Sequence, residues 1–459
     1  MASAKLDLGS VIDSAHLTRF HWMVIGACAV VTMLDGFDTQ SIAFVAPNIA
    51  LAWHLDPAKL GPVFGAGLFG GLLGAVFFGP LADRIGRKPV LLISVSVFGI
   101  GSLITPLFDS VPYLISARFV TGIGLGGAFP SAVALASEFA PRRLRSTLVS
   151  AMFCGFPLGA VIGGLASAKL IPHFGWRSVF LIGGVLPALL APLLLAVLPE
   201  SVKFLAHRGA RDKVARILGR LHCIGRWDGE LFGSQNSAVN APFAKLFSDG
   251  RASGTYLLWL TFFLSLLTTY LLISWIPVLA RGRGLGMQSA VVAVAMLNLG
   301  SIVGSILIGR LADHRDRAMF IGLGYVFGAF SIALLGILKG SEFEFCFVTF
   351  LAGACSLGAQ ICTVALCSAF YDTDSRSTGV GWSIAIGRIG AVVGPIIAGL
   401  MIGAGAPSGA LFFLASAASF GAATAVFAFG KLVPDGQALT ADRFTPSDQR
   451  SSFEVRSQK

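Results

Sequence analysis

The sequence predicts an all-α integral membrane protein in which twelve transmembrane helices form two parallel six-helix repeats. Three observations point to this fold class. Charged residues make up only 12% of the chain, about half of the roughly 25% found in soluble domains, and the mean hydropathy is +0.80. Apolar runs long enough to cross a bilayer recur along the whole chain. Short motifs of the first half return in the second half at a constant spacing.

The apolar runs fall into two sets of six, separated by a polar stretch. A membrane-spanning helix needs about 20 apolar residues. The runs occupy residues 22–52, 60–82, 89–108, 111–138, 146–168, 178–198, 253–280, 285–309, 318–338, 345–371, 377–403 and 408–430. The first run is too long for the apolar core of a signal peptide, so we expect it to remain as the first helix. The expected domains are an N-terminal segment over 1–21, six-helix bundles over 22–198 and 253–430, a central loop over 199–252 and a tail over 431–459.

Basic residues distinguish the two sides of the membrane. Most of the 34 Lys and Arg residues lie in the termini and connections on the side of the N-terminus. The opposite connections hold a smaller set: Lys59, Lys169, Arg177, Arg281, Arg283 and Lys339. Because positively charged loops stay in the cytoplasm, we expect both termini there, as an even number of spans also requires. We interpret the net charge of +11 as a topology signal and expect no nucleic-acid partner.

The two halves carry matching motifs. Residues 79–87, GPLADRIGR, correspond to residues 309–317, GRLADHRDR, at an offset of 230. Parallel repeats of this kind belong to a transporter architecture whose substrate site lies between the halves. Further matches, at an offset of 231, pair Arg145 with Arg376, Gly159 with Gly390 and Gly163 with Gly394.

Three charges lie inside predicted spans: two aspartates, which are candidates for proton coupling, and an arginine that must find a partner within the bundle. Asp35 and Asp38 lie in the first span, and Arg118 lies in the fourth. A charge at the bilayer centre costs about 2.5–3.5 kcal/mol on insertion scales and usually marks a functional site. Burial favours the neutral form of a carboxyl group, so a buried aspartate can take up and release a proton. The alternative is a permanent structural ion pair with arginine, and the sequence does not decide which aspartate carries the proton.

Arg388 is the candidate counter-ion for an anionic substrate. It lies near the middle of the eleventh span, and its repeat partner is Pro157, so the repeat does not require a charge there. A guanidinium group can hold a carboxylate through two parallel hydrogen bonds. The alternative is a salt bridge to the first span. The other candidate substrate contacts, each of which could instead serve helix packing, are Asp38, Gln40, Asn298, Gln360, Tyr270 and Trp382.

Several of these motifs resemble those of a known transporter superfamily. Residues 79–88, GPLADRIGRK, resemble the loop 2–3 motif of the major facilitator superfamily, and Arg118 with the glycines that follow it resembles its helix 4 motif. Within it, residues 35–39, DGFDT, and 387–390, GRIG, resemble the aromatic acid:proton symporter family. The resemblance implies the major facilitator fold and the import of a hydroxybenzoate-like anion with protons across a bacterial inner membrane by alternating access. It also implies that Arg118, with a helix 1 aspartate as its partner, takes part in proton coupling.

The resemblance also implies a latch on the cytoplasmic side. In the superfamily, the acid of the loop motif and nearby basic residues close that side in the outward-open state. We expect Asp83 to cap a helix N-terminus across the bundle and to pair with arginines of the loops. The second copy departs from the pattern at residues 315–317, which leaves its role open. The residues expected in gating are Gly79, Asp83, Arg84, Arg87, Lys88, Glu138, Arg145, Asp313 and Arg317.

Other functions stay open from the sequence alone. A sugar symporter or drug exporter of the same fold explains the spans, although a neutral sugar gives Arg388 no anionic partner. A membrane-bound sensor needs a signalling domain, for which the central loop and tail are short and polar. An enzyme needs a convergent catalytic or metal constellation, and the histidines are scattered. We therefore expect a monomeric transporter, not an enzyme, that works in the lipid bilayer without a metal or cofactor.

Overall fold

Helices form almost all of the structure, which is a computed structural model. It describes residues 6–7, 17–141, 143–221, 231–232, 243–248, 250–314, 316–338, 341–372 and 375–433. Among these residues, twelve spans are long and apolar enough to cross a membrane. This result confirms the predicted fold class, and most span ends agree with the predicted apolar runs to within a few residues.

The first half contains six spans, and its fifth span is broken at Cys154. The elements of this half are α2 (Arg19–Ala52), the 3₁₀ turn η1 (Pro57–Lys59), α3 (Leu60–Ile85), α4 (Arg87–Ile104), the 3₁₀ turn η2 (Thr105–Leu107), α5 (Val111–Phe139), α6 (Arg145–Phe153), α7 (Gly155–Phe174) and α8 (Arg177–Val197).

The second half also contains six spans, and its tenth span includes a π-helical turn. Its elements are α11 (Ala252–Gly282), α12 (Met287–His314), α13 (Arg317–Ile337), α14 (Glu342–Ala352), the π turn η4 (Gly353–Leu357), α15 (Gly358–Phe370), α16 (Arg376–Gly403) and α17 (Ser408–Leu432).

The polar connection between the halves forms short helices, which the sequence analysis did not anticipate. On α10, Val214 and Leu218 lie on one face and are buried against the first half, and this burial stabilises a short polar helix. The elements before and between the halves are the paired strands β1 (Leu6–Asp7) and β2 (Leu231–Phe232), α9 (Val202–His207), α10 (Arg211–Arg220) and η3 (Phe243–Leu246).

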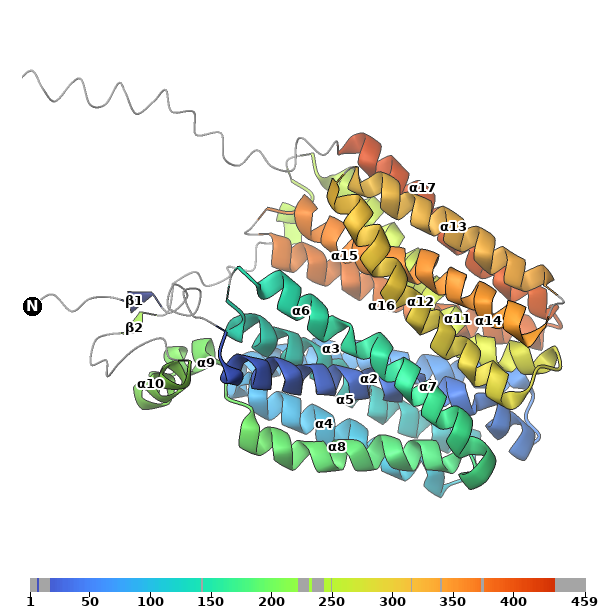
Figure 1. Ribbon diagram of the computed structural model, residues 1–459, viewed down its shortest axis with the longest axis horizontal. Coiled ribbons are helices and arrows are strands. Elements are labelled where there is room, and N and C mark those ends of the chain that lie inside the picture. Colours follow the sequence, from blue (N-terminus) through green and yellow to red (C-terminus); the bar gives the residue numbers. More distant parts are fainter. Residues whose placement is uncertain are drawn as a thin grey trace, which may run out of the picture.

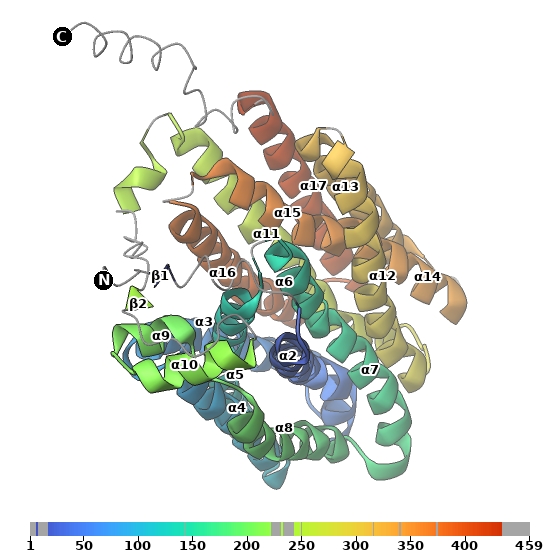
Figure 2. The same ribbon diagram turned by 60° about the vertical axis from the view of Figure 1, so that its left-hand side comes forward.

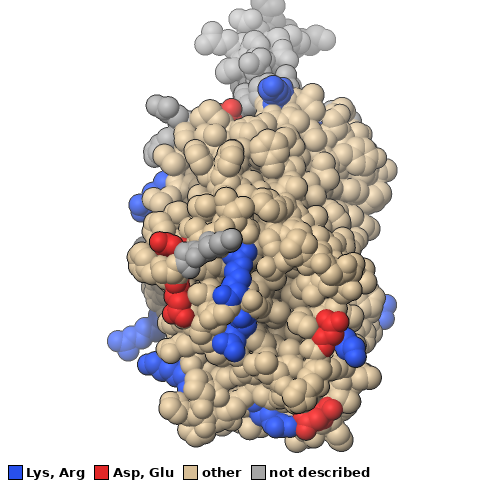
Figure 3. All heavy atoms as spheres, turned by 90° about the vertical axis from the view of Figure 1, so that its right-hand side faces the viewer, with Lys and Arg blue, Asp and Glu red and all other residues tan. Residues whose placement is uncertain are grey.

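The two six-helix sets lie side by side, and each has two distinct ends (Figure 1). We call the end at which α2 begins and α17 ends the terminal end, and the opposite end the distal end. Helices α9 and α10 lie at the terminal end of the first half (Figure 2). Figure 3 looks onto the distal end, where few Lys and Arg side chains are visible. This sparseness matches the charge asymmetry of the sequence.

Glycines bring helices of the first half into backbone contact. A Cβ atom added at Gly122 would overlap the carbonyl group of Gly67, and one added at Gly74 would overlap that of Ile123. Helices α3 and α5 therefore approach more closely than any larger residue would allow. A Cβ atom at Gly159 would likewise meet the Met33 carbonyl group, which joins α7 to α2. Close seams of this kind make the first half a tightly bound unit.

Contacts between the halves gather toward the distal end. The rings of Phe64 on α3 and Trp275 on α11 meet edge to face, with centroids 5.4 Å apart. The Trp275 ring is held in place within the second half, where its indole N–H donates to the Pro395 carbonyl of α16 at 3.1 Å. The backbones of Gly61 and Gly399 also touch: a Cβ atom at Gly399 would lie 2.9 Å from the Gly61 Cα. These contacts close the distal side of the interface between the halves.

Candidate functional site

Asp38 and Arg118 form a buried ion pair inside the first half. Their side chains are 0% and 2% exposed. One Arg118 nitrogen, Nη2, donates both to Asp38 Oδ2 and to the Asp38 carbonyl oxygen, each at 3.1 Å. The Ser102 hydroxyl of α4 donates to the other carboxylate oxygen, and the guanidinium lies 5.6 Å from the Phe180 ring centroid. The carboxylate of α2 is thus held by two neighbouring helices of the same half, α4 and α5, which favours a structural role.

The pair gives a stability prediction. We expect Asp38→Asn to destabilise the protein by about 3–5 kcal/mol, because it leaves the Arg118 charge buried without a counter-ion. The measurement is the thermal unfolding midpoint of purified protein. The double variant Asp38→Asn/Arg118→Gln, which removes both charges, should be more stable than the single variant, and a double variant whose losses simply add would contradict the pair.

Asp35 faces a different environment from Asp38, at the junction of the two halves. Its carboxylate accepts a hydrogen bond from Thr39 at 3.1 Å and interacts electrostatically with Arg388 of α16. The Tyr270 hydroxyl of α11 interacts electrostatically with both charges. Arg388 also donates to the Gly71 carbonyl of α3 at 2.9 Å. The structure therefore brings an acid of the first half together with a base and a phenol of the second.

Gln40 and Asn298 contact each other across the halves. The Gln40 amide donates to Asn298 at 3.0 Å, and the Asn298 amide donates back at 2.8 Å. Asn298 also donates to the Val294 carbonyl at 2.9 Å. Both side chains are buried. The two amides satisfy one another in this conformation, so their geometry favours a connection between α2 and α12.

Two other candidate substrate residues lie in separate surroundings. Trp382 is 44% exposed, and its ring contacts Phe243 and Trp259, with centroids 4.9 and 6.4 Å away. These three rings lie at the terminal end, on α16, η3 and α11. Trp382 precedes Arg388 on α16 by nearly two helical turns. Gln360 is half-buried on α15.

The gating residues gather at the terminal end of the first half. Arg87 forms an ion pair with Glu138, and the Ser201 hydroxyl donates to the same carboxylate at 2.5 Å. Asp83 is 77% exposed and lies 3.9 Å from Arg87. The expected cap by Asp83 across the bundle is absent from the contacts of the described residues. Glu200 instead caps a helix of its own half: the Arg87 and Lys88 N–H groups at the start of α4 donate to it at 2.9 and 3.1 Å.

Two of the remaining gating candidates of the first half, Lys88 and Arg145, bind backbone oxygens. The Lys88 ammonium donates to the Leu195 carbonyl at 2.7 Å, and the Arg145 guanidinium donates to the Ala140 carbonyl at 3.3 Å. The Arg84 carbonyl accepts from Arg208 at 2.5 Å. Gly79 is half-buried on α3.

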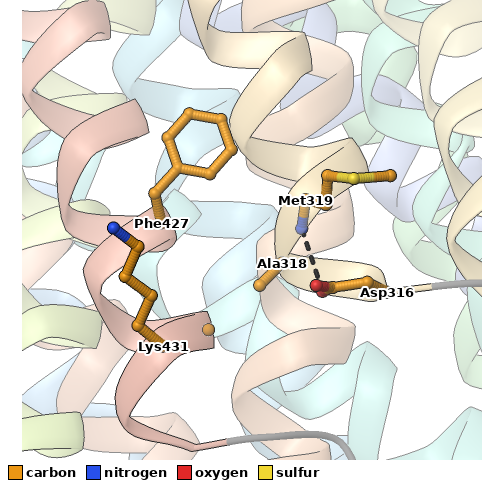
Figure 4. Close-up of a pocket in the computed structure, with 6 residues that line it drawn as sticks. Asp316, Ala318, Met319, Phe427 and Lys431 are labelled. Atoms are coloured by element: carbon orange, nitrogen blue, oxygen red, sulfur yellow. Dashed lines mark hydrogen bonds between the residues drawn. The ribbon is translucent and has the colours of Figure 1, made fainter.

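The second motif copy differs from the first for a local structural reason. In the first copy, Gly86 precedes α4 with a φ of 105° and leaves the room that Glu200 occupies. In the second copy, Asp316 precedes α13 and caps it with its own carboxylate, which accepts the Met319 N–H at 3.1 Å (Figure 4). Arg317 begins α13 and is exposed, and the side chain of Asp313 lies outside the described residues. The pocket beside this cap is lined by Asp316, Ala318, Met319, Phe427, Gly430 and Lys431.

The sequence analysis missed the residues that hold these charges in place. Ser102, Thr39, Ser201 and Glu200 each bind a charged group or a helix start. Hydroxyl residues are common in apolar spans, so Ser102 gave no signal, and Thr39 was noted as part of the motif at residues 35–39 without a role of its own. The Ser201 signal was available, because serine after an apolar run and before a polar helix is a typical N-cap; its side chain accepts the Phe204 N–H at 3.1 Å.

Comparison with known proteins identifies the relatives of the chain. The family model described as the Major Facilitator Superfamily matches residues 28–343 and 299–454. The chain is 39% identical over 408 residues to the "4-hydroxybenzoate transporter PcaK" of Pseudomonas aeruginosa, covering 88% of this chain and 91% of the relative. It is 39% identical over 432 residues to the "Gallate transporter" of Pseudomonas putida, covering 93% and 96%. It is 32% identical to the "Benzoate transport protein" of Acinetobacter baylyi, covering 87% of both chains.

Solved structures with the same fold are more distant in sequence. The xylose transporter XylE from E. coli, in a partially occluded inward open conformation, aligns with a TM-score of 0.69 at 17% identity and covers 91% of this chain and 98% of that one. A bacterial homologue of the human lysosomal transporter Spinster, in an inward-facing conformation, aligns with a TM-score of 0.67 at 19% identity, covering 91% and 95%. These matches show the shared architecture.

Proposed function

The chain belongs to the Major Facilitator Superfamily, and from this premise we propose that it imports an aromatic carboxylate together with protons. The relatives reported above carry names of aromatic acid transporters. The observation that carries the proposal within the structure is the electrostatic interaction of Asp35, Arg388 and Tyr270 at a junction of the halves where Arg388 also binds the Gly71 carbonyl. Asp35 can carry the proton, and Arg388 can bind the carboxylate of the substrate. The Tyr270 phenol can contact the aromatic ring of the substrate.

In the proposed cycle, the substrate carboxylate and Asp35 compete for Arg388. When Asp35 takes up a proton, its attraction for the guanidinium falls, and Arg388 is free to hold the substrate through two hydrogen bonds. Both charges are then neutralised, which lowers the cost of enclosing them between the halves. Loss of the proton to the opposite side restores the Asp35–Arg388 interaction and favours substrate release. The proton gradient drives accumulation, and the cycle uses no cofactor.

The distal contacts suit one state of alternating access. Phe64 with Trp275, and Gln40 with Asn298, join the halves on the distal side, so we assign this conformation to the state closed at that side. The basic connections at the terminal end support a cytoplasmic location for both termini. We place the protein in a bacterial inner membrane, as a monomer.

The direct test is uptake by purified protein in proteoliposomes with an imposed pH gradient. We expect labelled 4-hydroxybenzoate, gallate or benzoate to accumulate when the vesicle interior is alkaline, and D-xylose to be excluded. Adding a protonophore should abolish accumulation and leave exchange of labelled for unlabelled substrate intact. Uptake of xylose, or aromatic acid uptake that ignores the gradient, would refute the proposal.

Arg388 gives a prediction about affinity. Arg388→Lys keeps the charge but loses the planar fork, so we expect a benzoate-like ligand to bind roughly 10- to 100-fold more weakly, the range for one or two charge-assisted hydrogen bonds. Isothermal titration of purified protein measures the change. Arg376→Lys is the matched control, since Arg376 begins the same helix and is exposed. Equal affinities for the wild type and Arg388→Lys would remove Arg388 from the site.

A further inference from the structure

Helices α9 and α10 present a strongly basic surface at the terminal end of the first half. We call it the basic face, and it consists of Lys203, Arg208, Arg211, Lys213, Arg216 and Arg220, all exposed. On α10, Lys213, Arg216 and Arg220 share the side opposite Val214 and Leu218, which are buried. One side of this helix therefore packs on the protein and the other presents cations.

The basic face is attached firmly to the first half. Val202, Leu205 and Leu221 join a buried cluster with Val24 of α2 and Phe139 of α5. Glu200 and Ser201, immediately before α9, are bound to the start of α4 and to Glu138. The positions of these cations are thus set by buried contacts of the spans.

The acids of this region leave the basic face largely uncompensated. Glu138 and Glu200 point inward, to Arg87 and to the start of α4. Among the residues whose burial the structure describes, the exposed acids nearby are Asp83 and Asp212, against six exposed cations of the basic face. A surface with this excess of positive charge attracts anions.

The basic face begins where the apolar surface of the first half ends. The outward side of α3 and α8 is apolar as far as Phe77 and Leu195, which are 64% and 62% exposed, and on α3 the exposed charges of Asp83 and Arg84 follow. The Lys88 ammonium binds the Leu195 carbonyl at 2.7 Å, so cationic groups directly follow the apolar band. In a membrane this level is that of the lipid headgroups, and Figures 1 and 2 both place α9 and α10 beside the ends of these spans.

We propose that the basic face binds anionic phospholipid headgroups of the leaflet at the terminal end. Cationic juxtamembrane helices gain affinity for anionic lipid from each basic residue near the surface. Bound lipid would hold α9, α10 and the gating residues next to them at a fixed height against the bilayer. This inference is independent of the transported substrate.

The test compares lipids on intact protein in detergent. Dioleoyl phosphatidylglycerol and dioleoyl phosphatidylcholine are titrated separately, and native mass spectrometry counts the retained lipids. We expect a preference for phosphatidylglycerol that falls in Lys213→Gln/Arg216→Gln by roughly 25-fold, at about fivefold for each charge. The matched control Lys59→Gln/Lys169→Gln removes two exposed charges at the distal end and should keep the preference.

Two further experiments are needed. The first distinguishes the loss of charge from a folding defect, and the second distinguishes binding of lipid from binding of a free anion. The charge-preserving variant Lys213→Arg/Arg216→Lys should retain the preference for phosphatidylglycerol. Glycerol phosphate at equal concentration should leave lipid retention unchanged, because it lacks acyl chains. An undiminished preference in the glutamine variant, an equal loss in the distal control or in the charge-preserving variant, or displacement of lipid by glycerol phosphate would overturn the proposal.

Discussion

A disulfide across the distal end is expected to stop transport completely. A Cβ atom at Gly403 of α16 would lie 3.2 Å from the Cβ of Ala58 in η1, close to the roughly 3.5–4.5 Å between Cβ atoms in a disulfide. The pair Ala58→Cys/Gly403→Cys should therefore join the halves on oxidation. If the halves must separate at this end in each cycle, proteoliposome uptake falls to background and returns when a reductant is added.

The chain offers matched controls for this experiment. Gly164 and Ala295, on α7 and α12, give a second pair across the halves with a Cβ spacing of 3.3 Å, and its disulfide should have the same effect. Gly324 and Ala359 lie at 3.0 Å but within the second half, so that disulfide should permit transport. A variant that carries only one of the two introduced cysteines, in addition to the native ones, should still transport under oxidation. Normal uptake by a fully cross-linked Ala58–Gly403 pair would exclude opening at the distal end.

Loss of the Asp35 carboxyl group is expected to uncouple transport from the proton gradient. In the proposed cycle, Asp35 is neutral while the substrate is bound and becomes charged when the proton leaves. The Asp35→Asn side chain is neutral at every stage, so the variant cannot release a proton. We therefore expect labelled aromatic acid to exchange across the membrane but to reach no higher concentration inside than outside. The measurement is the accumulation ratio under an imposed pH gradient, with counterflow exchange as the control for folding and binding.

Asp38 tests whether this role is specific to Asp35. Asp38 is tied to Arg118 and Ser102 within one half, whereas Asp35 interacts with Arg388 of the other half. The double variant Asp38→Asn/Arg118→Gln should therefore still accumulate substrate if it folds. Gradient-driven accumulation in Asp35→Asn, together with its loss in the double variant, would assign the proton to Asp38.

Hydropathy was sufficient to predict the spans, but it could not predict where the helix within a span is broken or changes to a π turn. An average over about 20 residues does not register one broken turn at Cys154 or the π turn at Gly353–Leu357. The π turn lies where a Cβ atom at Gly353 would overlap the Leu297 carbonyl, so it depends on the neighbouring α12. Helix α10 was missed because its polar residues outweigh the buried Val214 and Leu218.

Charge inside the spans identified the candidate site, but partners depended on the fold. Charged residues are rare inside membrane spans, so Asp35, Asp38, Arg118 and Arg388 were easy to identify. The structure pairs Asp38 with Arg118 and places Asp35 near Arg388. Spacing along α2 placed both aspartates on one face and could not separate their environments, because the helices that surround them are far away in sequence. For the same reason, the mutual hydrogen bonds of Gln40 and Asn298 were not predictable, since 258 residues separate them.

The glycine seams make the first half behave as a rigid body. Backbone contact at Gly122 and Gly159 leaves little slack for shear between neighbouring helices, so strain introduced at the centre is transmitted along the full length of a span. A helix rises about 1.5 Å per residue, so the outer 13 or so residues of a span form an arm of roughly 20 Å, and a tilt of about 10° at mid-span sweeps its tip through roughly 3 Å. In the proposed cycle, a small rearrangement of hydrogen bonds around Arg388 would therefore produce a larger displacement at the ends of the spans.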